Sequence, residues 1–196
     1  MPPAIVQPFP GPAVLLDDDR DAELVQRCRR GDRHAFEELL GRYQRPIFNV
    51  ALRLLNHRED AKDVTQTVFM NVFRHFDRYD PAQRFFSWVY RIALHEVYDL
   101  TESRRPAVAL SDELPEERLS PDALAARGES DRAVQGALMA LKLEYRTVLV
   151  LKHVQGLSYE MLATILDCPV KTVKSRLYTA RQALRDVVLQ RGEVTL

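Results

Sequence analysis

The sequence predicts an all-α protein of two small helical domains, joined by a flexible acidic linker, with a helix-turn-helix ending the second domain. Apolar residues recur three and four positions apart through both halves of the chain, and no segment shows the alternation of a β-strand. Between the halves, residues 106–131 carry seven acids against two arginines, together with Pro106, Pro115 and Pro121. Such a composition favours a tether over a packed element.

Four segments follow from this reading of the 196 residues. Residues 1–18 begin with four prolines in ten positions and lack the basic start of a signal peptide, so we expect a disordered tail. Residues 19–104 form the first helical domain and residues 105–130 the linker. Residues 131–196 form the second helical domain.

The first domain reads as a series of amphipathic helices. A short helix ends at Gly31, Asp32 caps the next, and Pro46 is expected to open another. The segment 58–76 has the clearest helical period. Its expected buried stripe is Ala61, Val64, Val68, Val72, Phe73 and Phe76, and its expected outer face includes Asp60, Asp63, Gln66 and Asn71.

The helix-turn-helix spans residues 156–184. Ser158 is a good N-cap for its first helix, Leu157 and Leu162 are spaced as a hydrophobic staple, and Pro169 suits the start of its second helix. The second helix carries one apolar stripe, formed by Val170, Val173, Leu177, Ala180, Leu184 and Val187.

Charge is distributed unevenly along the chain. The formal net charge is zero, with 28 basic and 28 acidic residues, yet residues 168–191 hold six basic residues against one acid. The local distribution matters more than the sum. A solvated amphipathic helix would explain the basic face alone. Its combination with a preceding helix and a tight turn favours a helix that enters the major groove of DNA.

Other classes of protein lack support in the sequence. Cys28 and Cys168 are in no metal-ligand spacing and indicate a reduced compartment without a disulfide. No apolar run reaches the about 18 residues that a membrane span needs. His95-Glu96 begins like a zinc-protease motif, but Asp99 stands where the second ligand belongs. We therefore expect no enzyme activity, no cofactor, no metal and no membrane insertion.

Three segments carry a resemblance to a known family. In chain order they are HREDAKDVTQTVFMNVFRHF, RFFSWVYRIA and EYRTVLVLKHVQGLSYEMLATILDCPVKTVKSRLYTARQALR. Together they resemble the extracytoplasmic-function (ECF) class of bacterial sigma factors over residues 22–104 and 130–188. The resemblance implies a cytoplasmic transcription initiation factor. Its partners would be core RNA polymerase, promoter DNA and an anti-sigma factor.

The resemblance also implies roles for particular residues. Core polymerase would be bound through Asp60, Asp63, Gln66 and Asn71. The downstream (−10) promoter element would be held as single strand by Tyr79, Phe85, Trp88, Arg91 and His95, since aromatic and arginine side chains stack on unpaired bases. The upstream (−35) element would be read as duplex by Lys152, Lys171, Lys174, Ser175, Tyr178 and Arg181.

Three residues depart from the family pattern. Leu94 and His95 stand where Arg-Asn is usual, and Thr179 stands where many members have a basic residue. The alternative reading is a stand-alone helix-turn-helix regulator, in which residues 19–104 would sense a signal or form a dimer. That reading requires a sensor pocket or receiver pattern, and the first domain shows neither.

Overall fold

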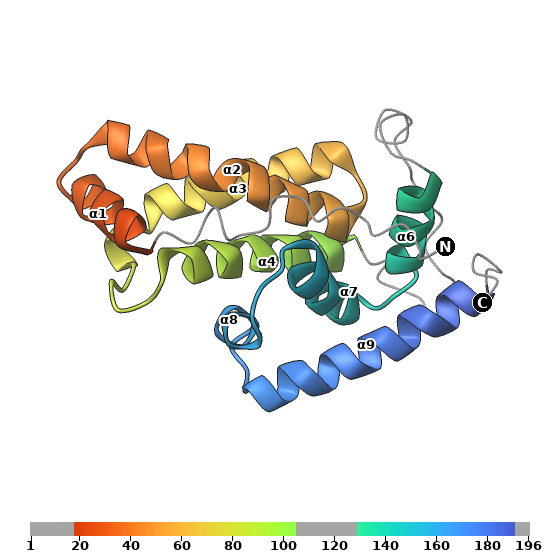
Figure 1. Cartoon of the computed structure of the whole chain (residues 1–196). Helices are drawn as coiled ribbons and strands as arrows, with labels where there is room; N and C mark the ends of the chain where they lie inside the picture. The colour runs from red at the N-terminus through yellow and green to blue at the C-terminus, as the bar shows by residue number, and fades with distance from the viewer. Residues whose placement is uncertain (1–17, 105–128, 191–196) are drawn as a thin grey trace.

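The computed structural model describes residues 18–104 and 129–190, which contain eight α-helices and no strand (Figure 1). The all-α prediction is confirmed for these residues. The predicted tail up to residue 17 and most of the predicted linker lie outside them. The first half contains α1 (Asp18–Arg29), α2 (Arg33–Leu55), α3 (Arg58–Arg74), the short 3₁₀-helix η2 (Phe76–Arg78) and α4 (Phe85–Ser103). The second half contains α6 (Glu129–Met139), α7 (Leu143–Leu149), the π-helix η3 (Val150–Val154), α8 (Tyr159–Ile165) and α9 (Val170–Gln190).

Local side-chain chemistry sets the helix boundaries in the first half. Gly31 follows α1 with a φ of +86°, a conformation that costs glycine little. The Asp32 side chain accepts hydrogen bonds from the backbone N–H groups of His34 and Ala35 and so caps α2, as the sequence predicts. Asn56, with a φ of 52°, ends α2 in the left-handed conformation typical of a C-cap.

The expectation that Pro46 begins a new helix is wrong, because α2 continues through it. A proline inside a helix removes one hydrogen bond and costs about 3 kcal/mol. The apolar stripe on both sides of the proline outweighs this cost: Tyr43, Ile47 and Val50 are each at most 1% exposed. Burying one such side chain contributes about 1.5–3 kcal/mol, and the stripe contains several.

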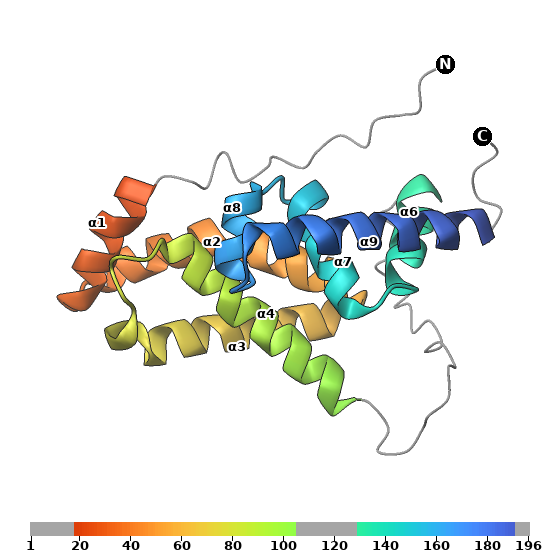
Figure 2. The same ribbon diagram turned by 90° about the horizontal axis from the view of Figure 1, so that it is seen from below.

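Helix α4 forms the centre of the molecule. It lies between the α2–α3 pair and α8, while α9 lies on the far side of α8 (Figures 1 and 2). One hydrophobic core extends through both halves, and it includes the fully buried Tyr90 of α4 and Leu151 of η3. The two halves are therefore packed against each other.

Buried Arg146 of α7 joins the two halves. Its guanidinium donates to the carbonyls of Leu138, Met139 and Leu141 at 2.9–3.0 Å, and also to the carbonyl of Leu54 at the end of α2. Carbonyls at the end of a helix have no partner within that helix, so one side chain supplies several missing donors. Burial lowers the pKa of Arg146 to about 10.

Further polar pairs cross the same interface. The hydroxyl of Tyr90 donates to Oε1 of Gln155 at 3.0 Å, and both residues are buried. Arg53 of α2 binds Asp131 of α6 at 2.8 Å. Buried polar groups are costly without hydrogen-bond partners, and Tyr90 and Gln155 supply partners to each other.

Candidate nucleic-acid and partner interfaces

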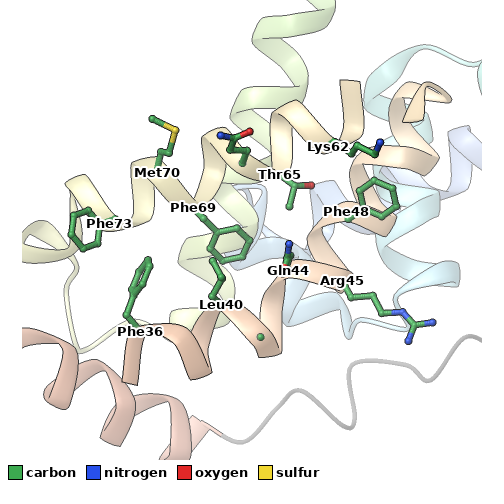
Figure 3. A pocket seen from close by; sticks show the side chains of 12 residues that line it. Phe36, Leu40, Gln44, Arg45, Phe48, Lys62, Thr65, Phe69, Met70 and Phe73 are labelled. Atoms are coloured by element: carbon green, nitrogen blue, oxygen red, sulfur yellow. The ribbon is translucent and has the colours of Figure 1, made fainter. Parts of the chain in front are cut away.

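An apolar groove of about 810 Å³ runs between α2 and α3, with α4 behind it (Figure 3). Phe73 is 69% exposed and Met70 44% exposed, and the ring of Phe73 meets the ring of Phe36 edge-on at 5.3 Å. The expectation that Phe73 is buried is wrong, because it lines this open groove. The lining residues are Phe36, Leu40, Gly41, Gln44, Arg45, Phe48, Lys62, Thr65, Gln66, Phe69, Met70 and Phe73. This open, largely apolar groove is a candidate interaction surface.

The polymerase residues expected on α3 differ in their surroundings. Asp63 and Gln66 are exposed, and Gln66 lines the groove. Asn71 donates instead to Oε1 of Glu96 on α4 at 2.8 Å, and it is half-buried. The groove side of α3 therefore presents Gln66 directly, with Asp63 nearby on the exposed surface of the same helix.

Asp60 lies inside the fold, so its expected place on the outer face is wrong. Its side chain is 8% exposed, its carboxylate accepts two hydrogen bonds from Arg104, and Nδ1 of His57 lies 3.0 Å from it. Burial alone would raise the pKa of Asp60, but the hydrogen bond and charge of Arg104 outweigh it and hold that pKa below its usual value. The carboxylate of Asp60 therefore connects the first turn of α3 to Arg104, the residue that follows α4.

The aromatic residues expected to hold single-stranded DNA form a cluster around Trp88. The centroid of the Trp88 ring lies 5.0 Å from the centroid of the Tyr79 ring and 5.7 Å from that of the Phe85 ring. Tyr79 is 5% exposed and Phe85 3% exposed, whereas Trp88 is half-buried. Burial raises the pKa of Tyr79 to about 12. Stacking by Tyr79 and Phe85 stays a prediction, and it would require both buried rings to leave their present packing.

Arg91 and His95 follow Trp88 on α4. Nη2 of Arg91 donates to the backbone carbonyl of Thr164 on α8 at 2.8 Å, so this guanidinium is held by the second half. His95 is exposed, and its Nδ1 lies 2.9 Å from the carboxylate of Asp99. The packing of the two halves thus occupies one of the residues expected to contact DNA.

The helix-turn-helix forms as predicted. The hydroxyl of Ser158 accepts a hydrogen bond from the N–H of Met161 at 3.1 Å, and Leu157 and Leu162 are both fully buried. These are the cap and the staple expected from the sequence. Asp167 turns the chain with a φ of 47° before α9 begins.

The basic face of α9 points to solvent. Tyr178 is 67% exposed. The residues expected to contact the upstream element on this helix are all exposed: Lys171, Lys174, Ser175, Tyr178 and Arg181. Lys152 lies on η3 instead, where its Nζ donates to the carbonyl of Leu157 at 2.8 Å. Five of the six expected residues therefore share one helix.

Two neighbours of this face were missed from the sequence. Nη2 of Arg181 lies 3.3 Å from Nε2 of His153, and the ring of Tyr159 faces the Nζ atoms of Lys152 and Lys174. Partial burial and then the charges of Arg181 and Lys152 lower the pKa of His153, which favours a neutral ring that accepts from Arg181. His153 was missed because it lies in the π-helix η3, where a regular helical period misplaces side chains. Tyr159 begins α8, and only the fold brings Lys152 and Lys174 to its ring.

Comparisons with known proteins agree with this architecture. Residues 39–106 match the family model of sigma-70 region 2, and residues 131–184 match that of sigma-70 region 4. The chain is 32% identical to the RNA polymerase sigma-H factor of Pseudomonas aeruginosa over 188 residues, covering 90% of this chain and 97% of that protein. It is also 32% identical to the ECF RNA polymerase sigma-E factor of Escherichia coli K12 over 180 residues, covering 86% and 94%.

A solved structure of CnrH in complex with the cytosolic domain of CnrY superimposes on this chain with a TM-score of 0.69. The sequence identity is 29%, and the match covers 87% of this chain and 97% of that one. The sigma factor RpoE of Bartonella quintana, solved with the anti-sigma factor NepR, shares the fold at a TM-score of 0.59 and 20% identity.

Two helical halves with a helix-turn-helix in the second define a two-part promoter-recognition protein. The chain belongs to the sigma-70 family of RNA polymerase sigma factors, within its ECF class. It is a transcription initiation factor that binds core RNA polymerase and directs it to promoters. Among residues 18–104 and 129–190, no helix has the length and apolar character of a membrane span.

Proposed function

We propose that the three surfaces divide the work of initiation. The α2–α3 groove and Asp63 bind core polymerase, the Trp88 face of α4 holds the melted downstream element, and the exposed face of α9 reads the upstream element as duplex. The observation that carries the proposal is the separation of an apolar groove on one half from a basic helix face on the other. The protein acts in the cytoplasm without catalysis of its own, alongside polymerase and DNA.

Charge and shape support the assignment of α9 to duplex DNA. Its exposed face carries Lys171, Lys174 and Arg181 without an acid among them, while Val173 and Leu177 on the opposite face are buried. A helix fits the major groove, and lysine and arginine side chains neutralise phosphates there. The assignment of α4 rests on Trp88, whose half-buried ring is next to Arg91 on the helix surface.

An anti-sigma factor is a further proposed partner. CnrH, to which this chain is similar in structure, was solved bound to the cytosolic domain of CnrY. The open apolar groove offers such a partner a surface here, since Phe36, Met70 and Phe73 line it. A partner bound in the groove would compete directly with core polymerase.

A footprint on one target promoter, with and without core polymerase, tests the proposed function. The chain alone is expected to give little protection, because one helix-turn-helix binds duplex near the non-specific range of about 10⁻⁴–10⁻⁶ M at physiological salt. Chain and core together are expected to give protection, an open complex and run-off transcript. Tight, sequence-specific protection by the chain alone, with no transcript on adding core, would support the stand-alone regulator instead.

Replacing Lys174 with alanine is expected to weaken binding to duplex DNA. If its ammonium neutralises a phosphate, the slope of log K against log salt falls in magnitude by about 0.9. If it reads a base, the loss is about 1–3 kcal/mol at a single promoter position. Fluorescence anisotropy over a salt series distinguishes the two cases. Lys142→Ala is the matched control, since Lys142 is exposed but lies outside α8 and α9. Equal slopes together with equal affinities for both variants would contradict the placement.

A further inference from the structure

Two lysines from different elements meet at one aromatic ring. Nζ of Lys152 lies 4.4 Å from the centroid of the Tyr159 ring, and Nζ of Lys174 lies 5.5 Å from it. Lys152 belongs to η3, Tyr159 begins α8, and Lys174 lies in the second turn of α9. The ring therefore connects three elements of the helix-turn-helix unit at one point.

The π-helix places Lys152 beside this ring. Within η3 the N–H of Gln155 bonds the carbonyl of Val150 at 3.0 Å, which is the five-residue spacing of a π-turn. The chain then turns so that the carbonyl of Leu157 accepts from Nζ of Lys152 at 2.8 Å. Lys152 is thus held by a hydrogen bond and by the ring face together.

Without the ring, the two ammonium groups would separate. Like charges repel, and a lysine side chain has about 2 kcal/mol of rotamer entropy to lose when it is fixed. The face of a tyrosine ring carries partial negative charge and attracts a cation within about 6 Å. Both ammonium groups lie within that range of the same ring.

One carboxylate lies close to the pair. Glu160 follows Tyr159, is exposed, and has its pKa lowered first by its hydrogen bonds to backbone and to Ser158, and then by the charges of Lys174 and Lys152. Its negative charge partly balances the lysines while DNA is absent.

We propose that Tyr159 is a positioning residue for duplex binding: its ring fixes the ammonium groups of Lys152 and Lys174 so that both reach phosphates of the same duplex. The inference rests on the proposed function of the α9 face. Tyr159 acts through the two lysines and needs no contact of its own with DNA. Its hydroxyl is therefore dispensable, and its ring is not.

The test compares Tyr159→Phe with Tyr159→Leu in the full chain, by anisotropy of a fluorescent duplex of about 20 base pairs over a salt series. Tyr159→Phe keeps the ring and is expected to bind within about twofold of the unchanged chain. Tyr159→Leu is expected to lose about three- to tenfold in affinity, with a shallower salt slope. Circular dichroism melts establish that each variant is folded, and Tyr159→Met replaces Tyr159→Leu should the latter fail to fold.

A double-mutant cycle that combines Lys174→Ala with Tyr159→Leu isolates the energetic coupling between the two residues in duplex binding. The loss from Lys174→Ala is expected to be clearly smaller in the Tyr159→Leu background than in the unchanged chain, because the lysine is already misplaced there. Additive losses, or a Tyr159→Phe variant as weak as Tyr159→Leu, would overturn the inference. If neither Lys174→Ala nor Lys152→Ala changed the duplex affinity of the otherwise unchanged chain, the proposed duplex face itself would be refuted. Failure of the Tyr159 inference and failure of the proposed function are therefore distinguishable.

Discussion

Asp63→Arg is expected to abolish run-off transcription while leaving the thermal unfolding temperature and the weak duplex binding of the chain unchanged. Asp63 is exposed on α3, close to Gln66 of the groove, so reversing its charge alters the proposed polymerase face without disturbing the core. A like charge placed opposite a partner's cation costs several kcal/mol in an interface. Affinity for core polymerase, measured by biolayer interferometry, should fall at least about tenfold, which is 1.4 kcal/mol.

Gly41→Leu tests the same surface by shape. Gly41 lines the groove, and a Cβ at this position would meet no atom within 4 Å. A side chain here fits the fold and removes the cost of a glycine inside a helix, about 0.5–1 kcal/mol relative to alanine. The variant should therefore remain folded, while its new side chain fills the groove and prevents docking.

Glu37 supplies the matched controls for both changes. It is exposed on α2 and does not line the groove, so Glu37→Arg and Glu37→Leu should leave transcription unchanged. Normal transcription from both Asp63→Arg and Gly41→Leu would show that polymerase docks elsewhere.

Arg146→Met is expected to lower the free energy of unfolding by about 3 kcal/mol or more. Methionine fills much of the space but donates nothing, so the carbonyls of Leu54, Leu138, Met139 and Leu141 lose a donor in a buried place. Each unsatisfied buried group costs about 1–3 kcal/mol. Burial lowers the pKa of Arg146, and the carbonyl contacts offset the cost of burying its charge.

Urea denaturation followed by circular dichroism measures this change. Arg146→Lys is the informative companion, because a single ammonium cannot span carbonyls that a planar guanidinium reaches together. It should destabilise nearly as much as Arg146→Met. A loss below about 1 kcal/mol for both variants would mean that water replaces the guanidinium.

The elements that depend on local chemistry were predictable from the sequence. Ser158, Leu157 and Leu162 lie within a few residues of one another, and together they fix the start of α8. Asp32 fixes the start of α2 in a similar way, as its N-cap. Caps and staples of this kind need no tertiary information. The helix-turn-helix and its basic face followed for the same reason, and the family comparisons agree with them.

The features that sequence reasoning missed depend on distant residues. From the sequence alone, Asp60 is expected to point to solvent. Only the fold brings Arg104, 44 positions later, beside its carboxylate. The helical spacing of Tyr90 from Phe86 is compatible with a buried ring, but only the fold shows that Gln155 of the second half accepts the hydrogen bond of its hydroxyl. The continuation of α2 through Pro46 likewise required knowing what its apolar stripe packs against.

If Arg91 contacts DNA as proposed, its hydrogen bond to the carbonyl of Thr164 has a consequence for affinity. While α8 occupies this guanidinium, only molecules in which the two halves have separated would offer the complete proposed α4 face to DNA. The apparent dissociation constant then equals the intrinsic one divided by that fraction, so each 1.4 kcal/mol in favour of the packed form weakens binding about tenfold. Tyr90 and Gln155 lie on neither proposed DNA face, yet they help set the populations of the two forms. On the proposed function, promoter affinity would therefore be adjustable at positions that never touch a nucleotide.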